Sequence, residues 1–295
     1  MDVGKPVSVT ALGAACGDPA AAVVGLTANG SEVELTPRGD GLYTGSFTPT
    51  AAGAVQLAAT ATATGGSDTR TVAGTATLAP AILPGGDPVT VTTTSPGEDA
   101  RLVFEGVAGR RISLKLSDVT IGTSCCSSAK ISILKPDGTT LLSASSFGTS
   151  GGFIDTKTLP QTGSYRILVD PQSNAVGSVT LTLYDVPEDP TGTLVLGGAA
   201  STLVLEVPGL NGWRTFSGTA GRTVTLRLTG VTIGTSCCSS AKVSVLRPDG
   251  TTLVSPANFG TSGKTLSFSL SATGVYSIFV DPQSNGVGSA TLSVS

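Results

Sequence analysis

The stretch VTIGTSCCSSAK stands at 119–130 and recurs letter for letter at 231–242. The match extends without a gap to FGTSG, found at 147–151 and again 112 residues later at 259–263. After one deleted residue, VDPQSNAVGS at 169–178 matches VDPQSNGVGS at 280–289. A unit of this length, with strand-like alternation and no helical period, predicts one β-sandwich or jelly-roll module per repeat.

Strands and turns can be read inside each repeat. Apolar and polar residues alternate in Ile112–Leu116 and Ile131–Leu134, and KPDG at 135–138 predicts a turn because Pro and Gly pre-set its backbone. The closing strands of the first repeat are predicted at Tyr165–Val169 and Val179–Leu183, around the turn-rich DPQSNAVG. In the second repeat the closing strands are predicted at Tyr276–Val280 and Ala290–Val294.

Residues 1–80 do not belong to the repeat. Their predicted strands, separated by Gly-rich turns, have the spacing of a small immunoglobulin-like sandwich: Val7–Leu12, Glu32–Thr36, Leu42–Phe47, Val55–Thr64 and Thr69–Leu78. The Pro-rich, acidic VPEDPTG at 186–192 predicts the border between the repeats. The expected fold is therefore all-β, with three tandem β-sandwich or jelly-roll domains at 1–80, 81–186 and 187–295.

Two resemblances accompany this organisation. DGLYTGSFTPTAAG at 40–53 resembles bacterial immunoglobulin-like modules. In the first repeat, RLVFEGVAGRRISL at 101–114 and LPQTGSYRILVDP at 159–171 are similar to pre-peptidase C-terminal domains, and to tandem repeats of large secreted bacterial proteins, including some with RHS/YD repeats. The resemblance implies a β-sandwich module that accompanies many functions, with some members binding extracellular polymers and some binding calcium. The second repeat departs from the first with Trp213 for Arg101 and Lys264 for Gly152.

Composition excludes several classes of partner. The net charge is −3 and Lys and Arg are scattered singly, so no basic face is available to bind nucleic acid. No window of about 18 apolar residues is present, so membrane insertion is not expected. The first residues, MDVGKPVSVT, lack the pattern of a secretory signal, and we expect one to have been removed. Low charge and abundant Thr, Ser and Gly favour an extracellular or cell-surface location.

The paired cysteines allow several interpretations. Zinc sites favour C-x2-C spacing, and the chain has no His; a redox site requires C-x-x-C at a helix N-terminus, which is missing. A disulfide needs Cα atoms within about 7 Å, whereas equivalent loops of two sandwiches laid end to end should be much farther apart. Bridges within each pair are therefore favoured, as vicinal disulfides of Cys125 with Cys126 and of Cys237 with Cys238. Free thiols retained through duplication are the alternative. Cys16 is the odd cysteine, either free or available to cross-link chains.

Other candidate sites are weaker. Without His, no imidazole base exists for Ser-His-Asp or Cys-His chemistry, and the acids stand in predicted turns, so we expect no catalysis. Oxygen-bearing side chains in the DPQSN segments could hold calcium, with Asp170 and Asn174 in one repeat and Asp281 and Asn285 in the other. The alternative is that these residues build the turn by bonding to the backbone.

The function expected from these observations is a non-enzymatic structural or adhesive module. It would act as a spacer or a self-assembling surface or filament component, with itself or other extracellular proteins and polymers as partners and no cofactor beyond possible calcium. The alternative is a carbohydrate- or polymer-binding module, possibly assisted by calcium, in which Trp213 stacks on a sugar ring. Aromatic residues make up only 4% of the chain, which favours the first reading.

Overall fold

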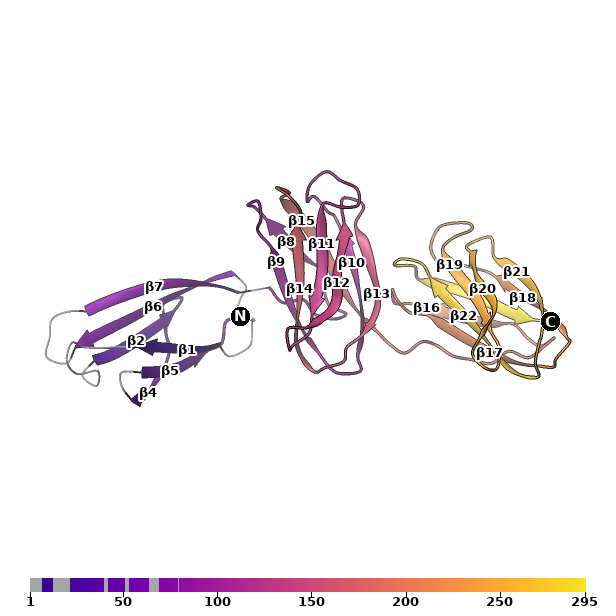
Figure 1. The fold of residues 1–295 in the computed structure, drawn as a ribbon, viewed down its shortest axis with the longest axis horizontal. Helices are drawn as coiled ribbons and strands as arrows, with labels where there is room; N and C mark the ends of the chain where they lie inside the picture. Colours follow the sequence, from indigo (N-terminus) through magenta and orange to yellow (C-terminus); the bar gives the residue numbers. More distant parts are fainter. Residues whose placement is uncertain (1–6, 13–21, 40–41, 51–52, 64–68, 79) are drawn as a thin grey trace. The chain divides into compact units, whose positions relative to one another are not determined.

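Strands are the only regular elements in the described part of this computed structural model, which covers residues 7–12, 22–39, 42–50, 53–63, 69–78 and 80–295 (Figure 1). The strands form six sheets, two from the N-terminal segment and two from each repeat. The predicted all-β class is confirmed, and no described residue belongs to a helix that could cross a membrane. The predicted domain borders stay predictions.

The N-terminal segment has two sheets, ordered β1-β5-β4 and β3-β2-β6-β7. Their strands are β1 Val7–Leu12, β2 Ala22–Ala28, β3 Ser31–Glu32, β4 Leu35–Gly39, β5 Leu42–Phe47, β6 Gly53–Ala63 and β7 Thr69–Leu78. The predicted strand Glu32–Thr36 is wrong, because it is interrupted at residues 33–34. These residues join β3 to β4, which belong to different sheets, and Val33 is buried in the core between them. The N–H of Val33 donates to the carbonyl of Leu26 at 2.9 Å. β2 was missed by the sequence reading.

The first repeat contributes sheets ordered β13-β10-β15-β8 and β12-β11-β14-β9. Its strands are β8 Val89–Thr93, β9 Ala100–Gly106, β10 Arg111–Ser117, β11 Ala129–Leu134, β12 Thr140–Phe147, β13 Gly152–Thr158, β14 Gly163–Pro171 and β15 Gly177–Val186. The predicted turn at 135–138 joins β11 to β12, with Gly138 at a φ of 83°. Thr139 N–H donates to Asp137 Oδ1 at 2.8 Å in the same turn.

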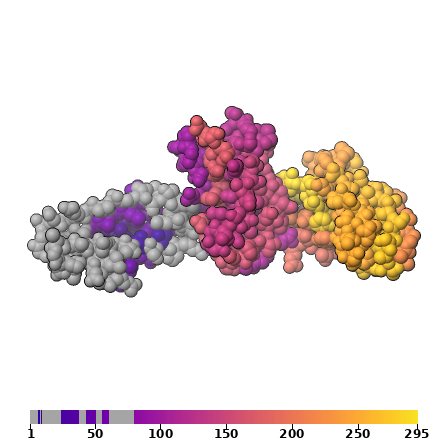
Figure 2. All heavy atoms as spheres, viewed as in Figure 1, coloured from indigo at the N-terminus to yellow at the C-terminus, as the bar shows by residue number. Residues whose placement is uncertain are grey.

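The second repeat has the same topology, strand for strand, with sheets ordered β16-β23-β18-β21 and β17-β22-β19-β20. Its strands are β16 Ser201–Leu205, β17 Gly212–Gly218, β18 Thr223–Thr229, β19 Ala241–Leu246, β20 Thr252–Phe259, β21 Lys264–Ser269, β22 Gly274–Pro282 and β23 Gly288–Val294. Figure 2 shows the outer surface of this repeat in orange and yellow.

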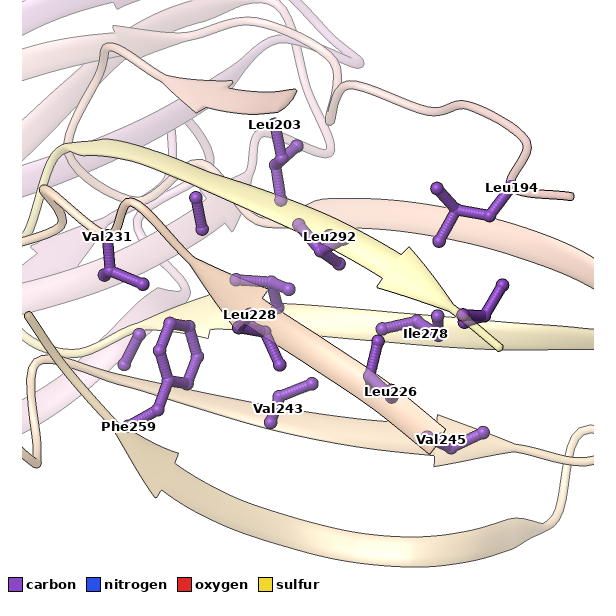
Figure 3. Packing of buried hydrophobic residues seen from close by; sticks show 14 of the residues in the cluster. Leu194, Leu203, Leu226, Leu228, Val231, Val243, Val245, Phe259, Ile278 and Leu292 are labelled. Atoms are coloured by element: carbon purple, nitrogen blue, oxygen red, sulfur yellow. The ribbon is translucent and has the colours of Figure 1, made fainter. Parts of the chain in front are cut away.

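Alternation places the core between the two sheets of each repeat. In β18, Leu226 and Leu228 are buried, and they face the buried Val243 and Val245 of β19 across the cluster (Figure 3). Burying each such side chain contributes about 1.5–3 kcal/mol. Phe259, the last residue of β20, is also buried and lies at one end of the cluster (Figure 3).

Candidate functional site

Three loops meet at one end of each repeat, and we call their assembly the cysteine-loop cluster. In the first repeat it comprises the cysteine loop 119–128, the glycine loop 147–151 and the Asp-Pro loop 170–177. In the second repeat it comprises 231–240, 259–263 and 281–288. The glycine loop donates two backbone hydrogen bonds to the cysteine loop, from Thr149 N–H to Ser124 O at 3.0 Å and from Ser150 N–H to Cys125 O at 3.1 Å. The Asp-Pro loop joins them through Gln172 N–H, which donates to Ser128 O at 2.9 Å.

Glycine allows the loops to approach this closely. A Cβ at position 148 would collide with the backbone of Ser124, Cys125 and Cys126, and Gly260 meets Ser236 and Cys237 in the same way. The glycine loop must therefore lie flat against the peptide that joins the paired cysteines. No larger residue fits without separating the two loops.

Hydroxyl groups fix the shape of the cysteine loop from within. Ser124 Oγ and Ser127 Oγ are 3.0 Å apart, and the Ser128 hydroxyl donates to Ser124 O at 3.0 Å. Thr120 Oγ1 accepts a 2.8 Å hydrogen bond from Ser178 N–H, which ties the cysteine loop to the start of β15. The second repeat reproduces all three contacts at 2.9, 3.0 and 2.8 Å, with Ser236, Ser239, Ser240, Thr232 and Ser289.

The sulfur atoms are paired within each loop, Cys125 with Cys126 and Cys237 with Cys238. All four residues are exposed. Among the described residues no group of three or more His, Cys, Asp or Glu side chains could hold a metal ion. Oxidation of the pairs in the purified protein stays a prediction. Cys16 lies outside the described residues.

Several exposed side chains of the cluster are identical in the two repeats without a local structural reason. Thr123, Thr149 and Asn174 are exposed, and their side chains make no hydrogen bond within the part of the chain that the structure describes. By contrast, the strands that follow the glycine loops have diverged completely, since GFIDTKT of β13 and KTLSFS of β21 share no residue at corresponding positions. The cluster surface is thus the same in both repeats although a neighbouring strand is not.

A hollow opens in the cluster of the second repeat. Its volume is about 530 Å³, and its lining is largely hydroxyl and amide groups with one exposed valine; it includes Thr235, Ser236, Ser240, Gln283, Asn285 and Val287. Val287 is 38% exposed and its counterpart Val176 is 39% exposed, so both repeats show an apolar side chain at this place. The sequence reading missed Thr123, Thr149 and Val176, although their identity between repeats beside diverged strands could have indicated them.

The calcium candidates lie in the Asp-Pro loops. Asp170 and Asn174 are exposed, and the Gln172 amide donates to the carbonyl of Asp170 at 3.1 Å. Asp281 is partly buried, and its carboxylate accepts a 3.0 Å bond from the Gln283 amide. Burial raises the pKa of Asp281, although the Gln283 bond opposes this. Asn285 lines the hollow instead. These contacts agree with a turn built by side-chain hydrogen bonds, and calcium binding stays a prediction.

Trp213 lies near the start of β17 and is partly buried; its partner in the sheet, Phe279, stands two residues before the Asp-Pro loop. Trp213 is directly opposite Phe279 of β22 in the sheet, and the two ring centroids are 4.4 Å apart. The first repeat has no such pair, because Arg101 and Leu168 occupy the corresponding positions. Trp213 thus packs its ring on a neighbouring aromatic side chain, and ligand stacking by Trp213 stays a prediction.

The acids near the border between repeats are engaged by arginines. Asp185 accepts two hydrogen bonds from Arg110, at 2.8 and 2.7 Å, and Asp189 pairs with Arg111 at 2.7 Å. The bond to Asp185, together with its charge, raises the pKa of Arg110. These contacts give the two carboxylates structural partners.

Comparison with known proteins identifies no family. No family model matches the chain, and no curated protein matches it. Among solved structures, the CUB1-EGF-CUB2 domain of human MASP-1/3 is 9% identical with a TM-score of 0.25, covering 70% of this chain and 99% of that chain. Tripeptidyl peptidase 2 is 10% identical with a TM-score of 0.36, and the match spans 99% of this chain and 32% of that chain. A carbohydrate-binding module of the β-sandwich superfamily is 14% identical with a TM-score of 0.22, covering 61% and 98%.

Proposed function

We propose that this chain is a non-enzymatic extracellular module, structural or adhesive, that presents two copies of one recognition surface. The surface is the cysteine-loop cluster, and the partner is another extracellular polymer or another copy of the chain. The carrying observation is the identity of exposed cluster residues in both repeats, Thr123, Thr149 and Asn174 among them, beside strands that have diverged. A role as part of a large secreted bacterial protein fits the resemblance of the repeats to pre-peptidase C-terminal domains.

The chemistry of the chain supports a role without turnover. The chain has no His, so a nucleophilic hydroxyl or thiol has no imidazole base. Asp137 and Asp249 are each bonded to a turn threonine, and Asp185 is bonded to Arg110. Duplication of a whole module adds reach or valency, because two weak sites on one chain gain avidity for a repetitive partner.

The decisive experiment is a binding and assembly screen of the full chain. Light scattering and electron microscopy, with and without reductant, report self-association, while immobilised polysaccharides and collagen, with and without calcium, report binding to other polymers. We expect association with at least one of these and no glycosidase or peptidase turnover. Turnover that disappears on replacing one carboxylate would overthrow the proposal.

A second candidate function is carbohydrate binding through the face of β17 and β22. It is favoured by one observation, the pair formed by Trp213 and Phe279, because a flat aromatic surface suits the apolar face of a sugar ring. Glycan binding that is lost in Trp213→Ala and kept in Thr215→Ala, a polar change on the same strand, supports this second candidate.

A further inference from the structure

We propose that the cysteine-loop cluster of each repeat binds a neutral glycan. The sugar would sit in the hollow beside Val287 in the second repeat and at the corresponding place beside Val176 in the first. This inference rests on the proposed function and names its site and ligand class.

The loop residues themselves carry little charge, and the nearest cation in the second repeat is Lys242 of β19, opposite Asp281 in the sheet. Within the loops of the first repeat the single charged residue is Asp170, at the edge of the Asp-Pro loop, and in the second it is Asp281. A phosphate, sulfate or carboxylate group would find no cation among these loop residues to bind it. The chemistry that remains suited to these loops is uncharged.

The uncharged groups match those of a sugar. The Thr235 hydroxyl and the Asn285 amide line the hollow and can each donate and accept hydrogen bonds, while Ser236 and Gln283 beside them are held by bonds to Ser239 and Asp281. Val287 supplies exposed apolar atoms, against which the C–H face of a pyranose ring can pack. Ligand pockets measure about 300–1,000 Å³ and combine apolar surface with a few polar groups. The 530 Å³ hollow lies within that range.

A protein partner suits the cluster less well. Stable protein interfaces bury about 800 Å² on each side and draw most of their energy from Trp, Tyr and Arg anchors. None of these residue types occurs in the loops of either cluster. The one aromatic residue of each cluster is Phe147 or Phe259, and both are buried in the core. A small hydroxylated ligand needs no such anchor.

Two copies on one chain suit a polymer of repeated sugars. When both clusters bind one strand, the second binding event is intramolecular, and apparent affinity can rise by about 10²–10⁴-fold over a single site. Loss of one cluster should therefore weaken binding steeply without abolishing it, whereas loss of both should abolish it.

The test is electrophoresis of the full chain through native gels that contain one soluble polysaccharide each. The panel holds neutral β-glucan, galactomannan and arabinan, with alginate as the acidic comparison. We expect at least one neutral polysaccharide to retard the chain and alginate to leave it unretarded. Asn174→Ala and Asn285→Ala should each weaken the apparent affinity at least tenfold, and the double variant should migrate as if no polysaccharide were present.

Matched controls separate the site from the fold. Thr140→Ala with Thr252→Ala changes exposed threonines at the start of β12 and β20, at the other end of these strands from the glycine loops, and should leave retardation unchanged. Thermal unfolding of every variant checks that it is folded. The double variant Thr123→Val with Thr235→Val changes a different side chain of each cluster and should also abolish retardation.

Three outcomes overturn the inference: no retardation by any neutral polysaccharide, retardation that survives the double variants, or retardation lost in Trp213→Ala alone. Self-association with no polysaccharide binding would overturn this inference and leave the proposed function standing. Cleavage of a panel polysaccharide by the chain would overturn the proposed function itself.

Discussion

Gly148 and Gly260 are the residues on which the geometry of each cluster depends. Adding one methyl group at either position places it against the cysteine-loop backbone. We predict that Gly148→Ala lowers the free energy of unfolding by about 1–3 kcal/mol, the usual cost of overpacking a filled site. Chemical denaturation monitored by far-ultraviolet circular dichroism measures the change.

Gly152→Ala is the matched control for this prediction. A Cβ at 152 would stand 3.8 Å from Leu116 Cδ1 and 3.9 Å from Phe147 Cβ, which are ordinary contacts. This variant should unfold within about 0.5 kcal/mol of the parent, as surface substitutions usually do. Equal stability of both variants would show that the glycine loop tolerates a side chain.

The paired cysteines provide a second prediction at the residue scale. In protein never exposed to reductant, alkylation under denaturing conditions should leave Cys125, Cys126, Cys237 and Cys238 unmodified, because the structure bonds each cysteine to its neighbour. Intact mass before and after reduction counts the protected thiols. Addition of alkyl groups to all four without reductant would favour the free-thiol alternative.

Asp137 carries a pH-dependent contribution to stability. Hydrogen bonds from the Thr139 hydroxyl, the Gln161 amide and the Thr139 N–H lower the pKa of Asp137 from 3.8 to about 2. Because the folded pKa is below the unfolded value, the carboxylate stabilises the fold above pH 3.8, and this contribution is lost as the pH falls through about 2.

The variant Asp137→Asn tests the direction of this pH dependence. Asp137→Asn should lower the midpoint of unfolding at pH 7, and this effect should shrink as the pH falls toward 2 and disappear below it. Asp249→Asn, which removes a carboxylate bonded to Thr251, should act in the same direction and less strongly, because the pKa of Asp249 is lowered mainly by the Thr251 hydroxyl and N–H. A destabilisation by Asp137→Asn that is constant from pH 7 to pH 2 would contradict the assignment.

At the scale of elements, β17 differs from its counterpart β9 by a buried arginine. Arg214 occupies the position of the buried Leu102, and its guanidinium donates to the Ser201 hydroxyl at 3.3 Å, to Trp213 O at 2.8 Å and to Thr202 O at 2.9 Å. Burial lowers the pKa of Arg214. The buried guanidinium is stabilised because each of these hydrogen bonds has an oxygen atom as its acceptor.

We predict that Arg214→Ala destabilises the second repeat by about 1–3 kcal/mol, because carbonyl oxygens lose their donor and packing is lost. Arg214→Leu, which installs the residue of the first repeat, should recover part of the loss through apolar packing. Urea denaturation of the two variants beside the parent measures the difference, and identical curves for Arg214→Ala and the parent would contradict it.

Strands with clean alternation were predictable, whereas loop assembly was not. β1, β5 and β7 match their predicted bounds; β1 alternates Val7, Val9 and Ala11 with polar residues, and all three strands are rich in the Val, Thr and aromatic residues that favour strands. The strand predicted at 32–36 was wrong because the chain passes from one sheet to the other at this point. Val33 N–H still bonds to Leu26 of β2, whereas β4 pairs with β5, and the sequence pattern does not show this change of sheet. The meeting of loops at 119–128, 147–151 and 170–177 depends on pairing between distant strands, which no local pattern reports. Gly148 signals it only once its neighbours are known.

At the scale of the whole molecule, the repeats share one topology, one cluster and the turn PDGTTL at 136–141 and 248–253, whereas β13 and β21 differ. We predict that the full chain hydrolyses neither the polysaccharides nor the peptides of the binding screen, since no imidazole is present and the acids are dispersed over turns. Reducing-sugar and fluorogenic peptide assays measure this, with a known glycosidase and a known peptidase as positive controls. Enzyme-concentration-dependent product formation would refute it.

Adjacent pairing of cysteines also bears on how such a chain can be lengthened. Four cysteines allow three connectivities, and a duplicated module would ordinarily risk bonds between the wrong copies during oxidation. Here each of these four cysteines has its partner at a sequence separation of 1, so the correct partner is always the thiol at the highest local concentration, even before the chain has folded. The ring also encloses too little chain to restrict the unfolded state much. Further copies of the module could therefore be appended in evolution without a growing burden of mispaired, misfolded product.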